Sequence, residues 1–315
     1  MRYLIVLFLY IGSLYAQSSN KIVYLVSDIR IPFWNIMAKG IENKANTLGY
    51  EIEILSANNI KKNEMQNLSK ALKDDIKGLI ISPINSSTAA TILKLAKLNN
   101  KPVVISDIGT DSGDYVSFIS SDNFQGAYEI GKILALKMKQ LGWDKDGSVG
   151  IISIPQKRAN GKARTAGFME ALNEYGIKGA GLLQQVDFSH QETYQHSMTL
   201  IKNNPNLKAL WLQGSDRYKA ALEAIKDSGK EGEILLLCFD AEPEFLDLIP
   251  KGVLVGAAMQ QPYLMGQKAI ESLHMYLNGE PIVKNNQLEV LAVSTDNIQN
   301  KLDIIKTNVL GIEKP

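Results

Sequence analysis

Apolar runs of strand length alternate with amphipathic segments of helix length along this chain. The run "KIVYLVS" precedes a helical segment at 34–48, and "IKGLIISP" precedes another at 87–99. Continuous stretches of Val, Ile and Leu are typical of strands that are buried on both faces of a parallel sheet. The alternation therefore predicts an α/β fold, in which helices cover parallel sheets and connect their strands by right-handed crossovers.

The alternation runs through two successive series. The first ends near "YVSFISSDN" and its following helix, and the second begins at "GSVGIISIP" and continues to "LEVLAVST". A chain of 315 residues also has the length of two domains rather than one. We therefore predict a duplication at the level of the fold, although the two halves show no close sequence repeat.

The first residues, "MRYLIVLFLYIGSLYAQSS", have the outline of a secretory signal peptide, with one early Arg, an apolar run and small residues ending at Ala16. The apolar run is too short to span a bilayer comfortably. No Cys follows it, so no lipid anchor is expected there. We predict that residues 1–16 are a cleavable signal peptide and that the mature protein is exported to the periplasm; the alternative is an uncleaved membrane anchor.

The sequence lacks the motifs that most enzymes of this architecture would need. The first strand is not followed by G-x-G-x-x-G, and neither a P-loop nor a G-x-S-x-G elbow occurs. His190, His196 and His274 form no metal-binding pattern and are expected on the surface, whereas the single Cys238 is expected in the core. The net charge of +1 marks no nucleic-acid partner. We expect no enzymatic activity, no metal and no cofactor.

Polar and aromatic residues instead gather where strands end. Phe33 and Trp34 follow the first strand, and Asp107 and Asp240 end the runs "VVISD" and "LLCFD". The carboxyl ends of parallel strands are where α/β proteins bind small molecules. Asp216, which follows "LWLQG", is expected to cap the next helix rather than to contact a ligand.

Several of these segments resemble the type I periplasmic solute-binding proteins, and in particular their ribose-binding branch. The segments that carry the resemblance, in the family's order, are "PFW", "AKGIE", "LGYEI", "IKGLIISPINSS", "SDNFQGAYEIGKILA", "RTAGFMEAL", "CFDA", "MQQPYLMGQKAIE" and "VLAVSTDNI". The resemblance covers residues 21–298.

The resemblance implies two Rossmann-like lobes with doubly wound parallel sheets, joined by three chain crossings that act as a hinge. We assign residues 21–121 plus 256–285 to the N-terminal lobe, and residues 122–255 plus 286–315 to the C-terminal lobe. The crossings are expected near 121–123, 258–261 and 294–296, where short polar or small segments follow apolar runs.

The resemblance also implies a set of ligand-binding residues. Aromatic rings would cover the apolar face of a sugar, and Asp and Arg would make charge-assisted hydrogen bonds to its hydroxyls. The expected set is Phe33, Trp34, Asp107, Arg164, Phe188, Ser215, Asp240 and Gln260. An alternative for Arg164 is a purely structural role, in which it holds its helix to a neighbour.

Three positions depart from the ribose-binding pattern. Ile31 and Ile108 stand where Asn and Arg are expected, and Ser215 stands where Asn is expected. A site forfeits about 1–3 kcal/mol for each unmatched polar group. The departures argue against ribose itself, and favour either another sugar or a smaller, less hydroxylated molecule.

The resemblance leaves two functions open. The chain is expected to be a monomeric binding protein that delivers a carbohydrate to an ABC permease. Alternatively, it reports ligand occupancy to a membrane histidine kinase or chemoreceptor. A repressor with the same lobes would need an N-terminal helix-turn-helix, where this chain has its signal peptide. A secreted enzyme is disfavoured because no catalytic set is present.

Overall fold

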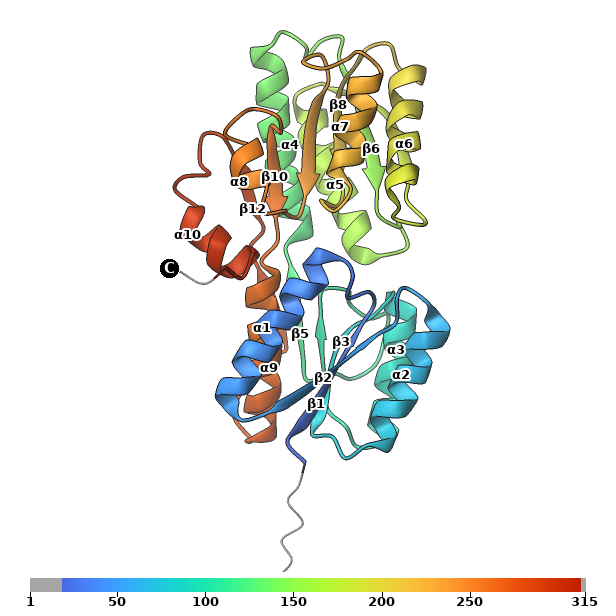
Figure 1. Ribbon diagram of the computed structural model, residues 1–315, viewed down its shortest axis with the longest axis vertical. Helices are drawn as coiled ribbons and strands as arrows, with labels where there is room; N and C mark the ends of the chain where they lie inside the picture. The colour runs from blue at the N-terminus through green and yellow to red at the C-terminus, as the bar shows by residue number, and fades with distance from the viewer. Residues whose placement is uncertain (1–18, 313–315) are drawn as a thin grey trace, which may run out of the picture.

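The computed structural model describes residues 19–312, which form two α/β lobes stacked along the long axis of the molecule (Figure 1). Each lobe contains a six-stranded sheet with helices on both faces. The predicted fold class of two α/β lobes is confirmed. The signal-peptide prediction for residues 1–16 lies outside the described residues.

The first lobe has a fully parallel sheet in the order β11-β5-β4-β3-β1-β2. Helices α1 and α9 pack on one face of this sheet, and α2 and α3 pack on the other. The elements of this lobe are β1 (Lys21–Val26), α1 (Pro32–Leu48), β2 (Glu51–Ser56), α2 (Lys61–Lys73), β3 (Gly78–Ser82), α3 (Ser86–Leu98), β4 (Val103–Ser106), β5 (Ser117–Ser121), α9 (Pro262–Leu277) and β11 (Asn285–Leu288).

The second lobe repeats this arrangement in the order β12-β10-β9-β8-β6-β7, with β12 antiparallel to β10. Helices α4 and α5 cover one face, and α6, α7 and α8 lie on the other. Its elements are α4 (Asn123–Gln140), β6 (Ser148–Ser153), α5 (Ala159–Glu174), β7 (Lys178–Gln184), α6 (His190–Asn203), β8 (Leu207–Leu212), α7 (Tyr218–Asp227), β9 (Leu235–Phe239), α8 (Phe245–Leu248), β10 (Gly256–Met259), β12 (Leu291–Ser294), α10 (Leu302–Ile304) and the π-helical turn η1 (Ile305–Val309).

The carboxyl ends of the parallel strands in the two sheets point toward each other, as the arrows in Figure 1 show. Loops that leave these ends therefore meet between the lobes. Among residues 19–312, none of the helices combines the length and the apolarity needed to traverse a membrane.

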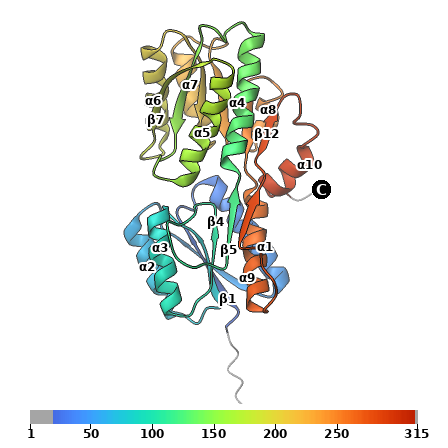
Figure 2. The same cartoon turned by 180° about the vertical axis from the view of Figure 1, so that it is seen from behind.

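Three segments connect the lobes and lie side by side (Figure 2). They are the junctions of β5 with α4, of β10 with α9, and of β11 with β12. The amide of Asp122 donates to the carbonyl of Leu288 over 2.9 Å, and Gln261 Nε2 donates to the carbonyl of Glu289 over 2.9 Å. These hydrogen bonds tie the third segment to the other two.

Two of the expected lobe boundaries need correction. Residues 256–259 were assigned to the first lobe, but they form β10, which pairs with β9 in the second sheet. Residues 286–288 were assigned to the second lobe, but they belong to β11, which pairs with β5 in the first sheet. The third crossing is therefore at Glu289 and Val290 and not at 294–296. The segment "NNQL" was missed because its polar residues give no apolar strand pattern.

The C-terminal segment contacts both lobes. Ile305, Val309 and Leu310 are buried in the core of the second lobe, and η1 also lies against α9 of the first lobe. Asn308 Nδ2 donates to Gln261 Oε1 over 2.9 Å, at the second crossing. The segment thus packs beside the hinge rather than trailing from the second lobe.

The helix pair α1–α9 depends on close backbone approach at glycine. A Cβ at Gly40 would collide with the carbonyl oxygen of Tyr263 on α9, a backbone atom that cannot rotate away. We predict that Gly40→Ala lowers the free energy of unfolding by about 1–3 kcal/mol, despite the better helix propensity of Ala. The adjacent, exposed Lys39→Ala is the control and should change it by less than about 0.5 kcal/mol. Equal unfolding midpoints of G40A and wild type in urea would contradict this packing.

Candidate functional site

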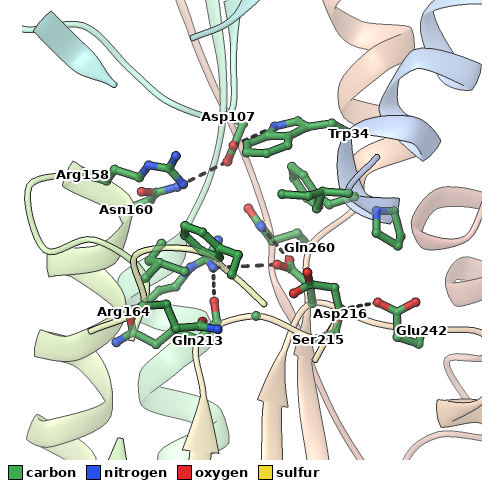
Figure 3. Close-up of a pocket in the computed structure, with 18 residues that line it drawn as sticks. Trp34, Asp107, Arg158, Asn160, Arg164, Gln213, Ser215, Asp216, Glu242 and Gln260 are labelled. Carbon is green, nitrogen blue, oxygen red and sulfur yellow. Dashed lines mark hydrogen bonds and ion pairs between the residues drawn. The ribbon is translucent and has the colours of Figure 1, made fainter. Parts of the chain in front are cut away.

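A cavity between the lobes collects side chains from the carboxyl ends of both sheets (Figure 3). All eight residues of the expected ligand-binding set line it, and Ile154, Arg158, Asn160, Gln185, Gln213, Asp216 and Glu242 line it as well, together with Ile31, Pro32 and Gly214. The two sheets and the hinge therefore bring together residues as distant in the sequence as Ile31 and Gln260.

Asp107 and Asp240 occupy corresponding places in the two lobes, because each directly follows its strand, β4 and β9 respectively. Both have left-handed backbones, with φ of 71° and 68°. The amide of Asp107 donates to Ile119 of β5, and the amide of Asp240 donates to Ala258 of β10. A non-glycine residue in this region is costly and persists only where its surroundings impose it. The strand ends hold both carboxylates in the cavity at this cost.

Asp107 is buried, and both of its carboxylate oxygens already have neighbours. Trp34 Nε1 donates to Oδ2 over 3.2 Å, and Asn160 Nδ2 donates to Oδ1 over 3.5 Å from the opposite lobe. Burial raises the pKa of Asp107 to about 6, while the nearby Arg164 guanidinium opposes that rise. The carboxylate is thus poorly solvated and available to a ligand that brings hydrogen-bond donors.

Arg164 anchors the centre of the second-lobe wall. Its Nε donates to Asn123 Oδ1 over 2.8 Å, and one terminal nitrogen donates to the carbonyl of Gln213 over 2.7 Å. The same nitrogen lies 3.8 Å from Asp240 Oδ2, and the guanidinium stacks 3.8 Å from the ring centre of Phe239. Arg164 therefore has structural contacts to the hinge and to β8 in addition to its place in the cavity.

Gln260 and Asp240 form a pair at the hinge side of the cavity. Gln260 Nε2 donates to Asp240 Oδ1 over 2.7 Å, while Gln260 Oε1 is buried and accepts no hydrogen bond. Burial raises the pKa of Asp240, and Arg164 opposes that rise. A buried acceptor without a donor costs free energy, so this corner of the cavity favours a group that can donate.

The aromatic residues form opposing walls. Phe33 and Trp34 meet edge to face with ring centres 6.2 Å apart at the start of α1, and both pack against the core of the first lobe. Phe188 faces the cavity from the second lobe with a left-handed backbone, φ 53°. Aromatic side chains on two sides of the cavity can cover the apolar faces of a ligand that binds between them.

The loop that carries Phe188 is fixed by the carboxylate of Glu192 in the first turn of α6. This carboxylate accepts from three consecutive amides, those of Val186, Asp187 and Phe188, over 2.7, 3.0 and 2.8 Å. Arg217 Nε donates to the carbonyl of Phe188 over 2.7 Å. Both peptide groups that flank the ring are thus held, which sets the position of the second aromatic wall.

The expected helix cap at Asp216 is wrong. The residue at the N-cap of α7 is Arg217, and no side chain caps this helix. Asp216 instead lines the cavity, and its Oδ2 lies 3.1 Å from a terminal nitrogen of Arg217. The Asp216 carboxylate is therefore paired with the Arg217 guanidinium and not with the backbone amides at the start of α7.

Ser215 and Glu242 extend the acidic side of the cavity. Ser215 Oγ donates to Glu242 Oε1 over 2.8 Å. Burial raises the pKa of the Glu242 carboxyl to about 7; the bond from Ser215 opposes this, and the nearby Asp216 carboxylate adds to it. The sequence analysis missed Glu242, although it lies only two residues beyond Asp240.

Arg158 and Asn160 were also missed, because the loop after β6 carries no pattern beyond its polar composition. The three histidines lie away from the cavity lining. His190 is exposed, whereas His196 and His274 are half-buried, and the Nδ1 of His274 lies 3.0 Å from the hydroxyl of Tyr50. Within residues 19–312 no group of three or more His, Cys, Asp or Glu side chains is placed to hold a metal ion, and Cys238 is buried.

Comparisons with known proteins agree with this architecture. Residues 22–281 match the model of the periplasmic binding protein domain family. The chain is 26% identical over 269 residues to the ribose import binding protein of Escherichia coli, covering 85% of this chain and 88% of that protein. It is 24% identical over 269 residues to the D-apiose import binding protein of Actinobacillus succinogenes, covering 84% and 85%.

Solved structures share the fold. A carbohydrate transporter solute-binding protein from Agrobacterium radiobacter, in complex with D-arabinose, superposes with a TM-score of 0.84 at 21% identity, covering 93% of this chain and all of that one. A periplasmic solute-binding protein from Actinobacillus succinogenes with bound D-allose gives a TM-score of 0.81 at 19% identity, covering 89% and 99%.

The raised pKa of Glu242 predicts a pH-dependent stability. The folded protein binds this proton more tightly than the unfolded chain does, so ionisation lowers stability as pH rises from about 4.5 to about 7. We expect Glu242→Gln to increase the free energy of unfolding of the ligand-free protein at pH 8 by about 1–3 kcal/mol, and to have little effect at pH 4.5. Denaturant titrations at both pH values measure this difference.

The neighbouring Glu244 provides the matched control, because its pKa is lowered by a hydrogen bond from Lys219. Glu244→Gln should therefore leave stability at pH 8 unchanged or slightly reduced. An E242Q variant that is less stable than wild type at pH 8 would contradict the unfavourable burial of this charge.

Proposed function

Because the chain belongs to the periplasmic binding protein family, we propose that it captures a sugar in the cavity between its lobes and delivers it to an ABC importer. The proposal places the mature protein in the periplasm, after removal of the signal peptide expected at residues 1–16. It assigns the chain a binding role and no catalytic one.

The observation that carries this proposal is the composition of the cavity. Aromatic side chains lie on two sides, and buried carboxylate, guanidinium and amide groups lie between them. A sugar ring presents apolar C–H faces and a girdle of hydroxyls that donate and accept, so it matches both kinds of surface. The relatives named for ribose and D-apiose import, and the folds seen with D-arabinose and D-allose, support the same class.

In this proposal the eight residues have distinct parts. Phe33, Trp34 and Phe188 cover the faces of the sugar, and Asp107 and Asp240 accept from its hydroxyls. Gln260 Oε1 accepts a further hydroxyl, since its amide nitrogen already donates to Asp240. Ser215 contributes through Glu242, to which its hydroxyl is bonded. Arg164 donates with the nitrogen positions that are left after its structural contacts.

The departures from the ribose-binding pattern bear on the identity of the sugar. Ile31 lies in the cavity wall, while Ile108 is buried in the core of the first lobe. Neither side chain can form a hydrogen bond, so two polar contacts that the resemblance implies are absent from the first-lobe side. The proposal therefore favours a sugar other than ribose, whose polar groups are directed mainly toward the second lobe.

Delivery requires that occupancy change the relation of the lobes. The three crossings allow a hinge bend, and a ligand that contacts Asp107 and Asp240 together favours the closed arrangement. A monomer suffices for this transfer to a permease. The same closure would serve a membrane sensor, the second candidate partner; neighbouring genes for a permease and an ATPase, or for a kinase, separate the two.

Sugar binding should stabilise the fold. We expect at least one of D-arabinose, D-allose, D-apiose and D-ribose to raise the melting temperature, because a ligand at 100 times its Kd adds about 2.7 kcal/mol. Asp107→Asn should weaken that sugar at least tenfold, since it removes a buried carboxylate acceptor. The measurements are thermal shift followed by calorimetric titration.

Asp111→Asn is the control for this substitution, because Asp111 is exposed in the loop that follows Asp107 and should leave affinity unchanged. If no sugar in the panel, extended to hexoses, polyols and furanoses, shifts the melting temperature, the carbohydrate proposal fails. Undiminished binding by D107N would instead remove the assigned role of Asp107.

A further inference from the structure

Arg158 is a buried cation in the cavity without a hydrogen-bonded partner. Its residue is 8% exposed, and it precedes α5 in the loop after β6. Its side chain makes no hydrogen bond to the described residues and no ion pair within 4.0 Å, and its guanidinium carbon lies 5.8 Å from the centre of the Phe188 ring. A guanidinium carries five N–H donors in a planar fork, and on Arg158 no protein acceptor occupies these donors.

Asp107 is the acid that most strongly stabilises the charge on Arg158. The Asp107 carboxylate, however, makes no ion pair with Arg158 within 4.0 Å, and its hydrogen bonds come from Trp34 and Asn160. Figure 3 shows Arg158 and Asn160 together at the Asp107 end of the cavity, away from Ser215 and Glu242. Asp107 thus compensates part of the charge on Arg158 without occupying its donor fork, which remains open to a ligand.

Arg158 also lines a second, outer groove between the lobes, which meets the cavity at Ile31, Arg158 and Phe188. Four cationic side chains line this groove, Arg30, Lys157, Arg158 and Arg217, against the two carboxylates of Asp28 and Asp187. Because Arg30 is paired with Asp28 and Arg217 with Asp216, the excess positive charge of this groove comes from Lys157 and Arg158 against Asp187. Such a surface attracts an anion and raises its local concentration.

The opposite end of the cavity is rich in acceptors. Gln260 Oε1 is buried without a donor, and Asp216 and Glu242 add carboxylate oxygens. A ligand must bring donors, such as hydroxyls, to that end. The two ends of the cavity thus match different groups on one ligand: an anionic acceptor at Arg158, and hydrogen-bond donors at the opposite end.

We propose that the ligand is a sugar acid: a polyhydroxylated molecule whose carboxylate binds the Arg158 guanidinium at the outer end of the cavity, while its hydroxyls donate toward Gln260, Asp216 and Glu242. This inference rests on the proposed capture of a carbohydrate and narrows its class. A carboxylate fills the guanidinium fork with two parallel hydrogen bonds and brings no proton of its own. A neutral hydroxyl fills one position and leaves the charge uncompensated.

Matched pairs of probes test this inference, each keeping the sugar ring and differing only in oxidation at C6: D-galactose and D-galacturonate, and D-glucose and D-glucuronate. Affinities are measured by calorimetric titration at pH 7 and fixed ionic strength. In the wild-type protein we expect the acid of at least one pair to bind at least tenfold more tightly than its neutral partner.

Arg158→Gln should abolish this preference, and Arg158→Lys, which keeps the charge but loses the fork, should retain only part of it. Lys162→Gln is the control, because Lys162 is exposed one turn further along α5 and outside both cavities. It removes the same charge and should leave the preference intact. Circular dichroism and melting temperatures verify that all three variants are folded.

Each outcome of these titrations supports or overturns either the inference or the proposed function. Binding of neutral sugars without an advantage for any acid overturns the inference while the proposed function stands. An acid preference that survives in R158Q overturns the role of Arg158. If neither member of any pair binds, the sugar-acid inference fails, and the broader panel of neutral sugars and polyols then decides the proposed function separately.

Discussion

The hydrogen bonds that tie the three crossings together determine where everything else in this molecule lies. Asp122 is bonded to Leu288, and Gln261 is bonded to Glu289 and Asn308, so the segments that leave the two sheets cannot separate independently. Arg164 adds a link from the first crossing, through Asn123, to the end of β8. These links hold the crossings together beside the cavity, where the carboxyl ends of the parallel strands in both sheets face each other and loops from both sheets meet.

The same arrangement forces charged groups out of water. Asp107, Asp240 and Arg164 lie between two lobes and are compensated by one another only in part, which explains why burial raises the pKa of both acids and lowers that of Arg164. Two of the three are acids held in left-handed backbone conformations. A cavity that is partly unsatisfied when empty gains most from a ligand that completes its hydrogen bonds, so local instability and binding have a common origin.

The distribution of these groups also separates this site from the pattern it resembles. On the first-lobe side Ile31 lies in the cavity wall and Ile108 in the core, at positions where the resemblance implies polar residues, whereas the second lobe contributes Arg158 at one end of the cavity and Glu242 at the other. Arg158 lies beside a positive outer groove, and Glu242 lies among acids. The cavity is therefore cationic at one end and acidic at the other, which is the basis of the proposed sugar-acid ligand.

The sequence by itself determined the two α/β series, since continuous apolar runs and amphipathic segments are local patterns that can be recognised without knowing which residues are in contact. Together with the resemblance, it also picked out eight residues that prove to share one cavity, because strand ends are visible in the sequence and parallel sheets bring them to one edge. Only the tertiary structure placed β11, whose polar residues pair through the backbone alone. It likewise showed that Asp216 lines the cavity instead of capping a helix, and that Arg158 and Glu242 line the same cavity. Their roles depend on which groups approach from the other lobe, and no local pattern records that.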